Sequence, residues 1–202
     1  MNKLSLATTL VLLPTVSVSY AFANDDSGLT REQQAAKTEV WEPVPEVVTF
    51  DENGVPSDAI KLLGDNLSAW ESVKEGEAAW SLDDGVLTVK PGTGDIKTKA
   101  SFCDVQLHVE WKSPEKIEGE GQHRGNSGVF LQGRYEVQVL DNNDNNTYVN
   151  GQVGSIYKQS IPLAKASVPT GEWNTYDIIY HAPEFNEGDK KTKSATITVI
   201  HN

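Results

Sequence analysis

The most regular feature of the chain is a strict alternation of apolar and polar side chains over residues 103–111. The apolar positions hold Cys103, Val105, Leu107, Val109 and Trp111, and the polar positions hold Asp104, Gln106, His108 and Glu110. A period of two is typical of a β-strand that has one buried face. We therefore expect a strand here, with the Cys103 thiol in the core.

Shorter apolar runs, separated by turn residues, predict further strands in the second half of the chain. They cover residues 127–132, 135–140, 173–180 and 194–201. Residues 80–82 and 86–89 flank an Asp-Asp-Gly turn, which predicts a β-hairpin. The predicted fold class is all-β, a jelly roll or similar sandwich of two antiparallel sheets.

The N-terminus has the features of a secretory signal peptide. Lys3 precedes an apolar stretch from Leu6 to Val18 and the small-x-small pattern Ala21-Phe22-Ala23. We expect residues 1–23 to be removed and the protein to be exported to a bacterial periplasm or the extracellular space. A membrane anchor is the alternative, but the apolar stretch is short and contains Thr and Ser. No membrane association is expected after cleavage.

Residues 24–58 are predicted to be a linker or N-terminal extension, with a polar helical turn over 30–37 and a proline-containing extended stretch after it. Residues 59–202 are predicted to form one domain. The last strand ends at Asn202, a residue type that favours the first position of a hairpin turn. Because the returning strand is absent, we expect the domain to be incomplete at its C-terminus.

Composition narrows the classes of function. The 202 residues include 17 Lys and Arg against 29 Asp and Glu, for a net charge of −12. A chain this acidic, without a basic cluster, repels a phosphate backbone, so no nucleic-acid partner is expected. The single cysteine excludes an internal disulfide framework and a cysteine-rich zinc module.

The first candidate catalytic residues lie on the strand predicted over residues 135–140. Glu136 and Gln138 share its polar face, and a β-bulge at the end of the strand would bring Asp141 to the same face. Two carboxylates on one sheet face could act as the acid and the nucleophile of a glycosidase. An ordinary solvent-facing strand explains the same pattern.

Two further groups could lie beside that face. Glu110 and His108 share the polar face of the strand described first, which could equally point to solvent. The glycine-rich loop 118–128 carries Arg124 and Asn126, whose side chains offer hydrogen-bond donors to sugar oxygens. The loop lacks the Gly-Lys-Ser/Thr ending of a phosphate loop, and a flexible connection between strands is the alternative.

The loop Asp141–Asn146 contains only Asp and Asn, whose oxygens suit calcium. Asn146 occupies the position where a calcium loop needs glycine, and Gln152 the position of the bidentate glutamate. An Asx-rich turn is therefore favoured over a calcium site. The four histidines lack metal-ligand spacing, so neither a zinc site nor another cofactor is expected.

Six motifs occur in a fixed order. They are LLGDNLSAW at 62–70, VEW at 109–111, RGNSGVF at 124–130, YEVQVLD at 135–141, GSIY at 154–157 and GEWNTYD at 171–177. Together they resemble the 3-keto-disaccharide hydrolase domain family, also described as 3-keto-glucoside lyase/hydratase, over about residues 59–202. The resemblance implies a concanavalin A-like jelly roll. Family members usually continue with another strand past the point where this chain ends.

The resemblance also implies chemistry on a glycoside already oxidised at C3. The C3 ketone acidifies the C2 proton, a base removes that proton, the enolate expels the C1 substituent, and water adds to the resulting enone. Expected roles follow from this chemistry. The base would be Glu136 or Glu110, Arg124 and Asn126 would bind the carbonyl or enolate oxygen, Asp141 would assist departure, and Gln138, His108 and Tyr157 would orient the sugar.

Two other functions remain open. The spacing of Glu136, Gln138 and Asp141 also resembles the Glu-x-Asp-x-x-Glu strand of retaining jelly-roll glucanases, although Gln and Asp replace two of its carboxylates. A non-catalytic carbohydrate-binding module is the third possibility, because jelly rolls perform both roles. The 3-keto-glycoside enzyme is the favoured hypothesis.

Overall fold

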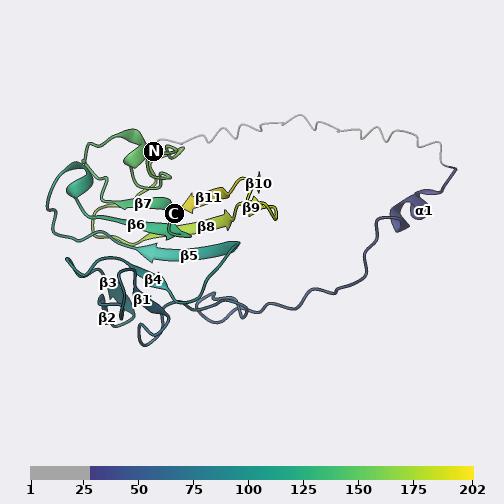
Figure 1. Cartoon of the computed structure of the whole chain (residues 1–202), viewed down its shortest axis with the longest axis horizontal. Coiled ribbons are helices and arrows are strands. Elements are labelled where there is room, and N and C mark those ends of the chain that lie inside the picture. The colour runs from purple at the N-terminus through teal and green to yellow at the C-terminus, as the bar shows by residue number, and fades with distance from the viewer. Residues whose placement is uncertain (1–27) are drawn as a thin grey trace, which may run out of the picture. The chain divides into compact units, whose positions relative to one another are not determined.

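The computed structural model describes residues 28–202, and the signal peptide expected over 1–23 lies outside them. The chain divides into two units after Ala59. Their helices and strands are labelled in Figure 1. Within residues 28–202, no helix is both long enough and apolar enough to cross a lipid bilayer.

The first unit contains the short helix α1 (Arg31–Ala36). Thr30 and Gln33 form a capping box, in which the Gln33 N–H donates to Thr30 Oγ1 at 3.2 Å and the Thr30 N–H donates to Gln33 Oε1 at 2.9 Å. None of the α1 residues is buried, so the cap and the local backbone hydrogen bonds hold the helix rather than packing. The helical turn predicted over 30–37 is confirmed.

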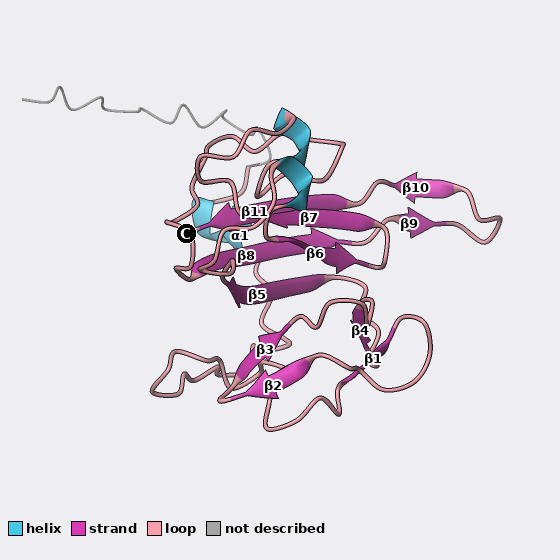
Figure 2. Ribbon diagram, turned by 90° about the vertical axis from the view of Figure 1, so that its left-hand side faces the viewer, coloured by secondary structure: helices cyan, strands magenta, loops and turns pink. Residues whose placement is uncertain are grey.

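The second unit, Ile60–Asn202, consists mainly of antiparallel strands (Figure 2). The strands are β1 (Trp70–Ser72), β2 (Ser81–Asp83), β3 (Val86–Thr88), β4 (Ile96–Thr98), β5 (Val105–Trp111), β6 (Asn126–Leu131), β7 (Tyr135–Leu140), β8 (Asn174–His181), β9 (Glu184–Phe185), β10 (Lys191–Lys193) and β11 (Thr196–His201). Two 3-10 turns, η1 (Gly121–His123) and η2 (Val149–Gly151), lie in the connections.

The core lies between a three-stranded sheet, in the order β11–β8–β5, and the hairpin β6–β7. Alternate residues of β5 and β8 turn inward, as their period-two patterning predicts, whereas β7 is buried on both faces from Val137 to Leu140. The buried apolar residues are Trp111, Leu131, Val137, Val139, Leu140, Val153, Tyr176, Ile178 and Tyr180. Each fully buried side chain of this size stabilises the fold by roughly 1.5–3 kcal/mol.

Two buried tyrosines also satisfy their polar ends. Tyr176 donates its hydroxyl hydrogen to the Gln138 carbonyl at 2.7 Å, and Tyr180 donates to Gln132 Oε1 at 2.9 Å. The Tyr176 bond links β8 to β7 across the core. It also avoids the free-energy cost of a buried hydroxyl that has no hydrogen-bond partner. The expected all-β fold is confirmed.

Two local expectations are wrong. Cys103 is exposed, because β5 begins at Val105 and the thiol precedes the buried part of the alternation. No bulge shifts the end of β7, since its register with β6 is regular up to the pair Asn126 and Leu140. Asp141 therefore keeps the parity of Val137 and Val139 instead of joining the Glu136 face.

Candidate active site

The polar face of β7 points away from the sandwich core. Val137 and Val139 belong to the core, so Glu136 and Gln138, which alternate with them, lie on the opposite face. Asn126 and Gly128 lie on the same face of β6, because Asn126 pairs with Leu140 and Gly128 pairs with Gln138. This face, which we call the β6–β7 outer face, is where the structure gathers half of the expected site residues.

A loop segment runs antiparallel along the free edge of β7. The Tyr157 N–H donates to the Glu136 carbonyl at 2.9 Å, the Gln138 N–H donates to the Ser155 carbonyl at 3.0 Å, and Val137 bridges Ile156. In this register Tyr157 stands directly opposite Glu136 and on the same face. The motif that supplied Tyr157 therefore positions it beside the candidate base.

Glu136 lies over a glycine of the neighbouring strand. A Cβ atom at Gly128 would be 2.8 Å from Glu136 Cγ, so a residue with a side chain there would displace the carboxylate. Glu136 is half-buried, and burial raises its pKa, as does the negative charge of Asp95. A carboxylate whose ionised form is made less favourable in this way is a stronger base than an exposed one.

A network of side-chain amides begins at Gln138, the next residue after Glu136 on the outer face of β7. Gln138 is 1% exposed and donates from Nε2 to Gln122 Oε1 at 2.8 Å and to the Gly151 carbonyl at 3.3 Å. Gln122 Nε2 donates to the same carbonyl at 2.9 Å and to Thr147 Oγ1 at 2.8 Å. Because a carbonyl can only accept, it fixes the orientation of both amides.

The network reaches the edge of the β6–β7 outer face. Asn126 Nδ2 donates to the Gln122 carbonyl at 2.7 Å, which holds an exposed amide in place. Gln138 Oε1 is buried with no hydrogen-bond partner among the described residues. Sequence reasoning missed Gln122, although it lies in the glycine-rich loop already singled out.

A pair of tyrosines borders the same face. The Tyr148 and Tyr157 hydroxyls form a short hydrogen bond, and their ring centroids are 6.1 Å apart. The Lys158 ammonium lies 5.4 Å from the Tyr157 ring centroid and 5.9 Å from that of Tyr148. The Tyr148 ring packs on Gly151, where a Cβ atom would collide with it.

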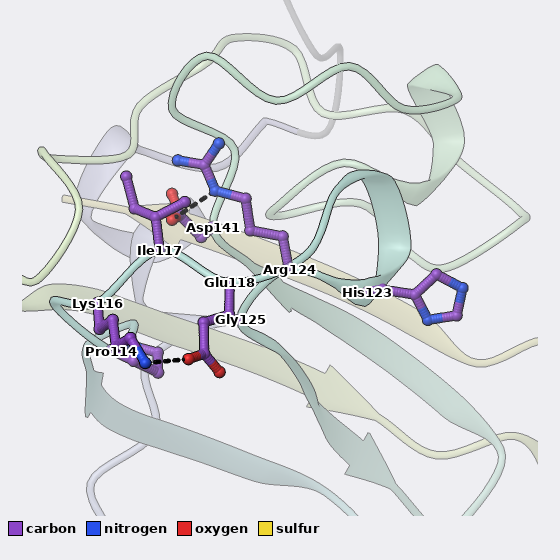
Figure 3. Close-up of a pocket in the computed structure, with 8 residues that line it drawn as sticks. All are labelled: Pro114, Lys116, Ile117, Glu118, His123, Arg124, Gly125 and Asp141. Carbon is purple, nitrogen blue, oxygen red and sulfur yellow. Dashed lines mark hydrogen bonds and ion pairs between the residues drawn. The ribbon is translucent and has the colours of Figure 1, made fainter.

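Arg124 and Asp141 form a separate group beside a cavity of about 280 Å³ (Figure 3). Arg124 Nε donates to Asp141 Oδ2 at 3.0 Å, and Thr170 Oγ1 donates to Asp141 Oδ1 at 2.9 Å. Both charged side chains are almost fully buried. Burial alone would raise the pKa of Asp141, but hydrogen bonds from Thr170, Asn143 and Arg124, with the guanidinium charge, outweigh it and lower that pKa.

The structure does not bring Glu110 and His108 to Glu136. Both side chains lie on the exposed face of β5, which is the face opposite its core positions. His108 Nδ1 lies 2.7 Å from Asp177 Oδ1 on the neighbouring strand β8. Since β5 and β7 turn their apolar faces to the same core, these polar groups lie on opposite sides of the sandwich.

The Asp- and Asn-rich loop uses its side-chain oxygens within the protein. Asn142 Oδ1 accepts from the Val153 N–H at 2.9 Å, and Asn145 Oδ1 accepts from the Gly121 N–H at 2.7 Å. These bonds attach the loop to η1 and to the segment after η2. Among the described residues, no group of three or more His, Cys, Asp or Glu side chains could hold a metal ion.

The sandwich domain matches a known protein family. The sequence model of the 3-keto-alpha-glucoside-1,2-lyase-like domain matches residues 58–202, which include every strand of the sandwich. The chain belongs to this family. Membership in the 3-keto-alpha-glucoside-1,2-lyase-like family confirms the resemblance found in the motifs and makes the protein a member of a group of carbohydrate-active enzymes.

Two solved structures from Parabacteroides distasonis ATCC 8503, each provisionally named a glycosyl hydrolase, are similar to this chain. The first is 57% identical, with a TM-score of 0.78, over 87% of this chain and 76% of that chain. The second is 20% identical, with a TM-score of 0.45, over 65% of this chain and 67% of that chain. No curated protein matches the chain.

Proposed function

We propose that the protein cleaves the glycosidic bond of 3-keto-glycosides, with Glu136 as the base that removes the C2 proton. The observation that carries the proposal is the half-buried Glu136 carboxylate, whose pKa is raised by burial and by the charge of Asp95, on a face lined by fixed amide groups. Family membership over residues 58–202 supports the substrate class.

The reaction needs a base but not a second ionised carboxylate. The C3 ketone allows the enolate to form, the C1–O bond then breaks, and water adds to C1 of the enone while C2 regains a proton. Tyr157, which lies beside Glu136, and Asn126, which lies further along the same face opposite Leu140, would contact the hydroxyls of the sugar. Gln138 and Gln122 would hold these contacts in place, because their own amides are buried or anchored.

Arg124 and Asp141 have a different role in this proposal. Their charges pair with each other, and the remaining bonds of Asp141 go to Thr170 and Asn143. A carboxylate with a lowered pKa is a poor proton donor. We therefore assign this pair to holding the loops on either side of β6 and β7 together.

The pairing of Asp141 with Arg124 also disfavours the mechanism of a retaining glucanase. That mechanism uses two carboxyl groups about 5–5.5 Å apart on either side of the bond. Asp141, the second carboxylate of the strand, has the opposite parity to Glu136 and is committed to Arg124. If the protein binds a glycan but does not cleave it, it is a non-catalytic carbohydrate-binding module.

The test compares two matched substitutions. Glu136→Gln removes the base and keeps the shape, so we expect at least a roughly 100-fold loss of kcat on a 3-keto-glucoside. Glu110→Gln makes the same chemical change on the exposed face of β5 and should keep wild-type activity. The kcat of both variants is measured from the rate of leaving-group release, monitored by chromatography. Full activity in Glu136→Gln would overturn the proposal.

We also propose that the protein is exported after cleavage before Asn24. The support is the pattern of Lys3, the apolar stretch and Ala21-Phe22-Ala23. N-terminal sequencing of the protein recovered from periplasmic and culture fractions tests this. A cytoplasmic protein that retains Met1 would contradict it.

A further inference from the structure

The tyrosine pair beside Glu136 has features that a purely structural contact does not need. Tyr148 is 42% exposed, and its hydroxyl bonds the hydroxyl of Tyr157 instead of solvent. Lys158, the next residue, has a φ of 57°, a left-handed conformation that is uncommon for residues other than glycine. Its backbone N–H donates to the Asn150 carbonyl at 2.8 Å, and its ammonium group lies over both rings. Such local strain is often found at functional sites.

We propose that Tyr157 is the proton donor to the departing glycosidic oxygen, and that Tyr148 and Lys158 stabilise the phenolate left on it. This inference rests on the proposed function and supplies the acid that Asp141 does not provide. It assigns the step to a pair of phenols and an ammonium group.

Position on the sheet favours Tyr157 as the donor. The reacting proton is on C2 and the leaving oxygen is on the adjacent C1, so the base and the acid must stand side by side. Directly opposed residues of neighbouring antiparallel strands have Cβ atoms about 4.5–5.5 Å apart. Glu136 and Tyr157 flank the bridge between Val137 and Ile156, and the Tyr157 N–H donates to the Glu136 carbonyl, which places the two residues beside each other.

The hydrogen bond between the two phenols also suits Tyr157 as the proton donor to a substrate. The hydrogen bond to Tyr157 raises the pKa of Tyr148 to about 12, with smaller contributions from burial and from the charges of Tyr157 and Glu136. Either hydroxyl can be the donor in this bond. When Tyr148 donates to the Tyr157 oxygen, the hydroxyl hydrogen of Tyr157 points at a substrate. A phenolate on Tyr157 would accept the Tyr148 hydrogen bond and face the Lys158 charge.

The proton movements balance over one turnover. Glu136 takes the C2 proton, the electron pair of that C–H bond forms the enolate, and its collapse breaks the C1–O bond. The leaving oxygen takes the Tyr157 proton and departs as an alcohol. Water then adds its oxygen to C1 and returns one proton to the Tyr157 phenolate, while Glu136 returns its proton to C2. The sum is hydrolysis of the glycosidic bond, with both side chains restored.

Substrates with different leaving groups test the inference. An alkoxide must be protonated as it departs, whereas a nitrophenolate is stable without a proton. For Tyr157→Phe we expect kcat to fall at least about 100-fold on methyl 3-keto-glucoside, and less than about 10-fold on the nitrophenyl analogue. Tyr148→Phe and Lys158→Met should show the same selective loss at a smaller size, about 5–10-fold on the methyl substrate only, with KM unchanged.

Controls separate this inference from the proposed function. Glu136→Gln should lose both substrates, and full activity there would overturn the proposed function itself. Tyr135→Phe, on the core-facing side of β7, should keep both activities. Thermal unfolding checks that Tyr157→Phe folds. If that variant does not fold, the kinetics of Lys158→Met test the acid assignment instead, because the Lys158 side chain is exposed and its substitution should not affect folding. The acid assignment would be overturned if Glu136→Gln is inactive but the tyrosine and lysine variants lose activity equally on both substrates. It would also be overturned if those variants lose no activity on either substrate.

Discussion

Glu136 and Asp141 lie five residues apart, yet their surroundings give them opposite acid–base properties. Glu136 is half-buried beside the charge of Asp95, and its pKa is raised. Asp141 is more deeply buried but accepts hydrogen bonds from Thr170 and Arg124, and its pKa is lowered. Desolvation decides the first case, and hydrogen bonds with an opposite charge decide the second. A base and a structural anion therefore come from one short stretch of chain.

The pKa of Glu136 predicts the acid side of the pH–rate profile. Because the base must be ionised, kcat/KM should fall as the pH drops through a value above the ordinary 4.5 of a glutamate. Asp95→Asn removes a negative charge that raises this pKa, so the fall should move to lower pH. Asp84→Asn, on the turn between β2 and β3, should leave it in place. A profile that does not move in Asp95→Asn would contradict the assignment.

The buried pair of Arg124 and Asp141 predicts a large effect on stability. Arg124→Met leaves the Asp141 carboxylate buried without its cation, so the free energy of unfolding should fall by about 3–5 kcal/mol. Lys116→Met, which removes the exposed partner of Glu118 at the same cavity, should change it by less than about 1 kcal/mol. Urea denaturation measures both. An Arg124→Met loss as small as that of Lys116→Met would show that the pair is not holding the loops.

The same pair makes stability depend on pH. The pKa of Asp141 is lowered below its ordinary 3.8 in the folded protein, so its contribution is complete above the unfolded value. It is lost as the pH falls through the lower, folded value. Urea midpoints below about pH 4 should therefore decline more steeply in the wild type than in Asp141→Asn.

At the scale of elements, the hairpin β6–β7 and the loop along its edge form the site. β7 presents Glu136, β6 leaves room for it at Gly128, and the segment that ends at Tyr157 extends the sheet by backbone hydrogen bonds. The ladder with β6 on one side of β7, and the bridge between Val137 and Ile156 on the other, set which side chains meet. The geometry of the site is thus a consequence of strand register.

Gly128→Ala tests this dependence on register. The added Cβ atom would stand 2.8 Å from Glu136 Cγ, so the carboxylate must move and kcat should fall about 10–100-fold with little change in unfolding. Gly64→Ala is the matched control, because a Cβ atom there meets nothing within 4 Å. Steady-state kinetics on a 3-keto-glucoside compares them. Wild-type kcat in Gly128→Ala would contradict the placement of Glu136.

Strand patterning predicted most elements of this fold but only part of the site. Alternation located β5, and apolar runs located β6, β7, β8 and β11, because each strand buries one face. Alternation gives the face of a side chain within its own strand, and says nothing of the sheet to which that strand belongs. For this reason it could not separate Glu110 and His108 from Glu136. Gln122 escaped notice because its role depends on contacts with Gln138 and Gly151, which are distant in sequence.

At the scale of the whole molecule, everything that the proposed reaction uses lies within Ile60–Asn202. Among residues 28–202, all buried core residues belong to this unit, as do Glu136, the amide network and the tyrosine pair. The first unit contributes α1, which buries no side chain, and a stretch in which Trp41 and Val47 remain largely exposed. The net charge of −12 suits a neutral sugar better than an anionic one.

This division predicts that the first unit can be removed. A variant that begins at residue 58 should unfold within a few degrees of the full protein and keep its kcat on a 3-keto-glucoside, because no core side chain is lost. A variant that begins at residue 73 also loses β1, which pairs with β4, and the Trp70 Nε1 bond to the Leu62 carbonyl at 2.6 Å. Its midpoint should fall clearly further, since a paired strand is removed from the unit. Differential scanning calorimetry compares the three proteins, and a fall as large for the first variant as for the second would mean that residues 24–57 stabilise the sandwich.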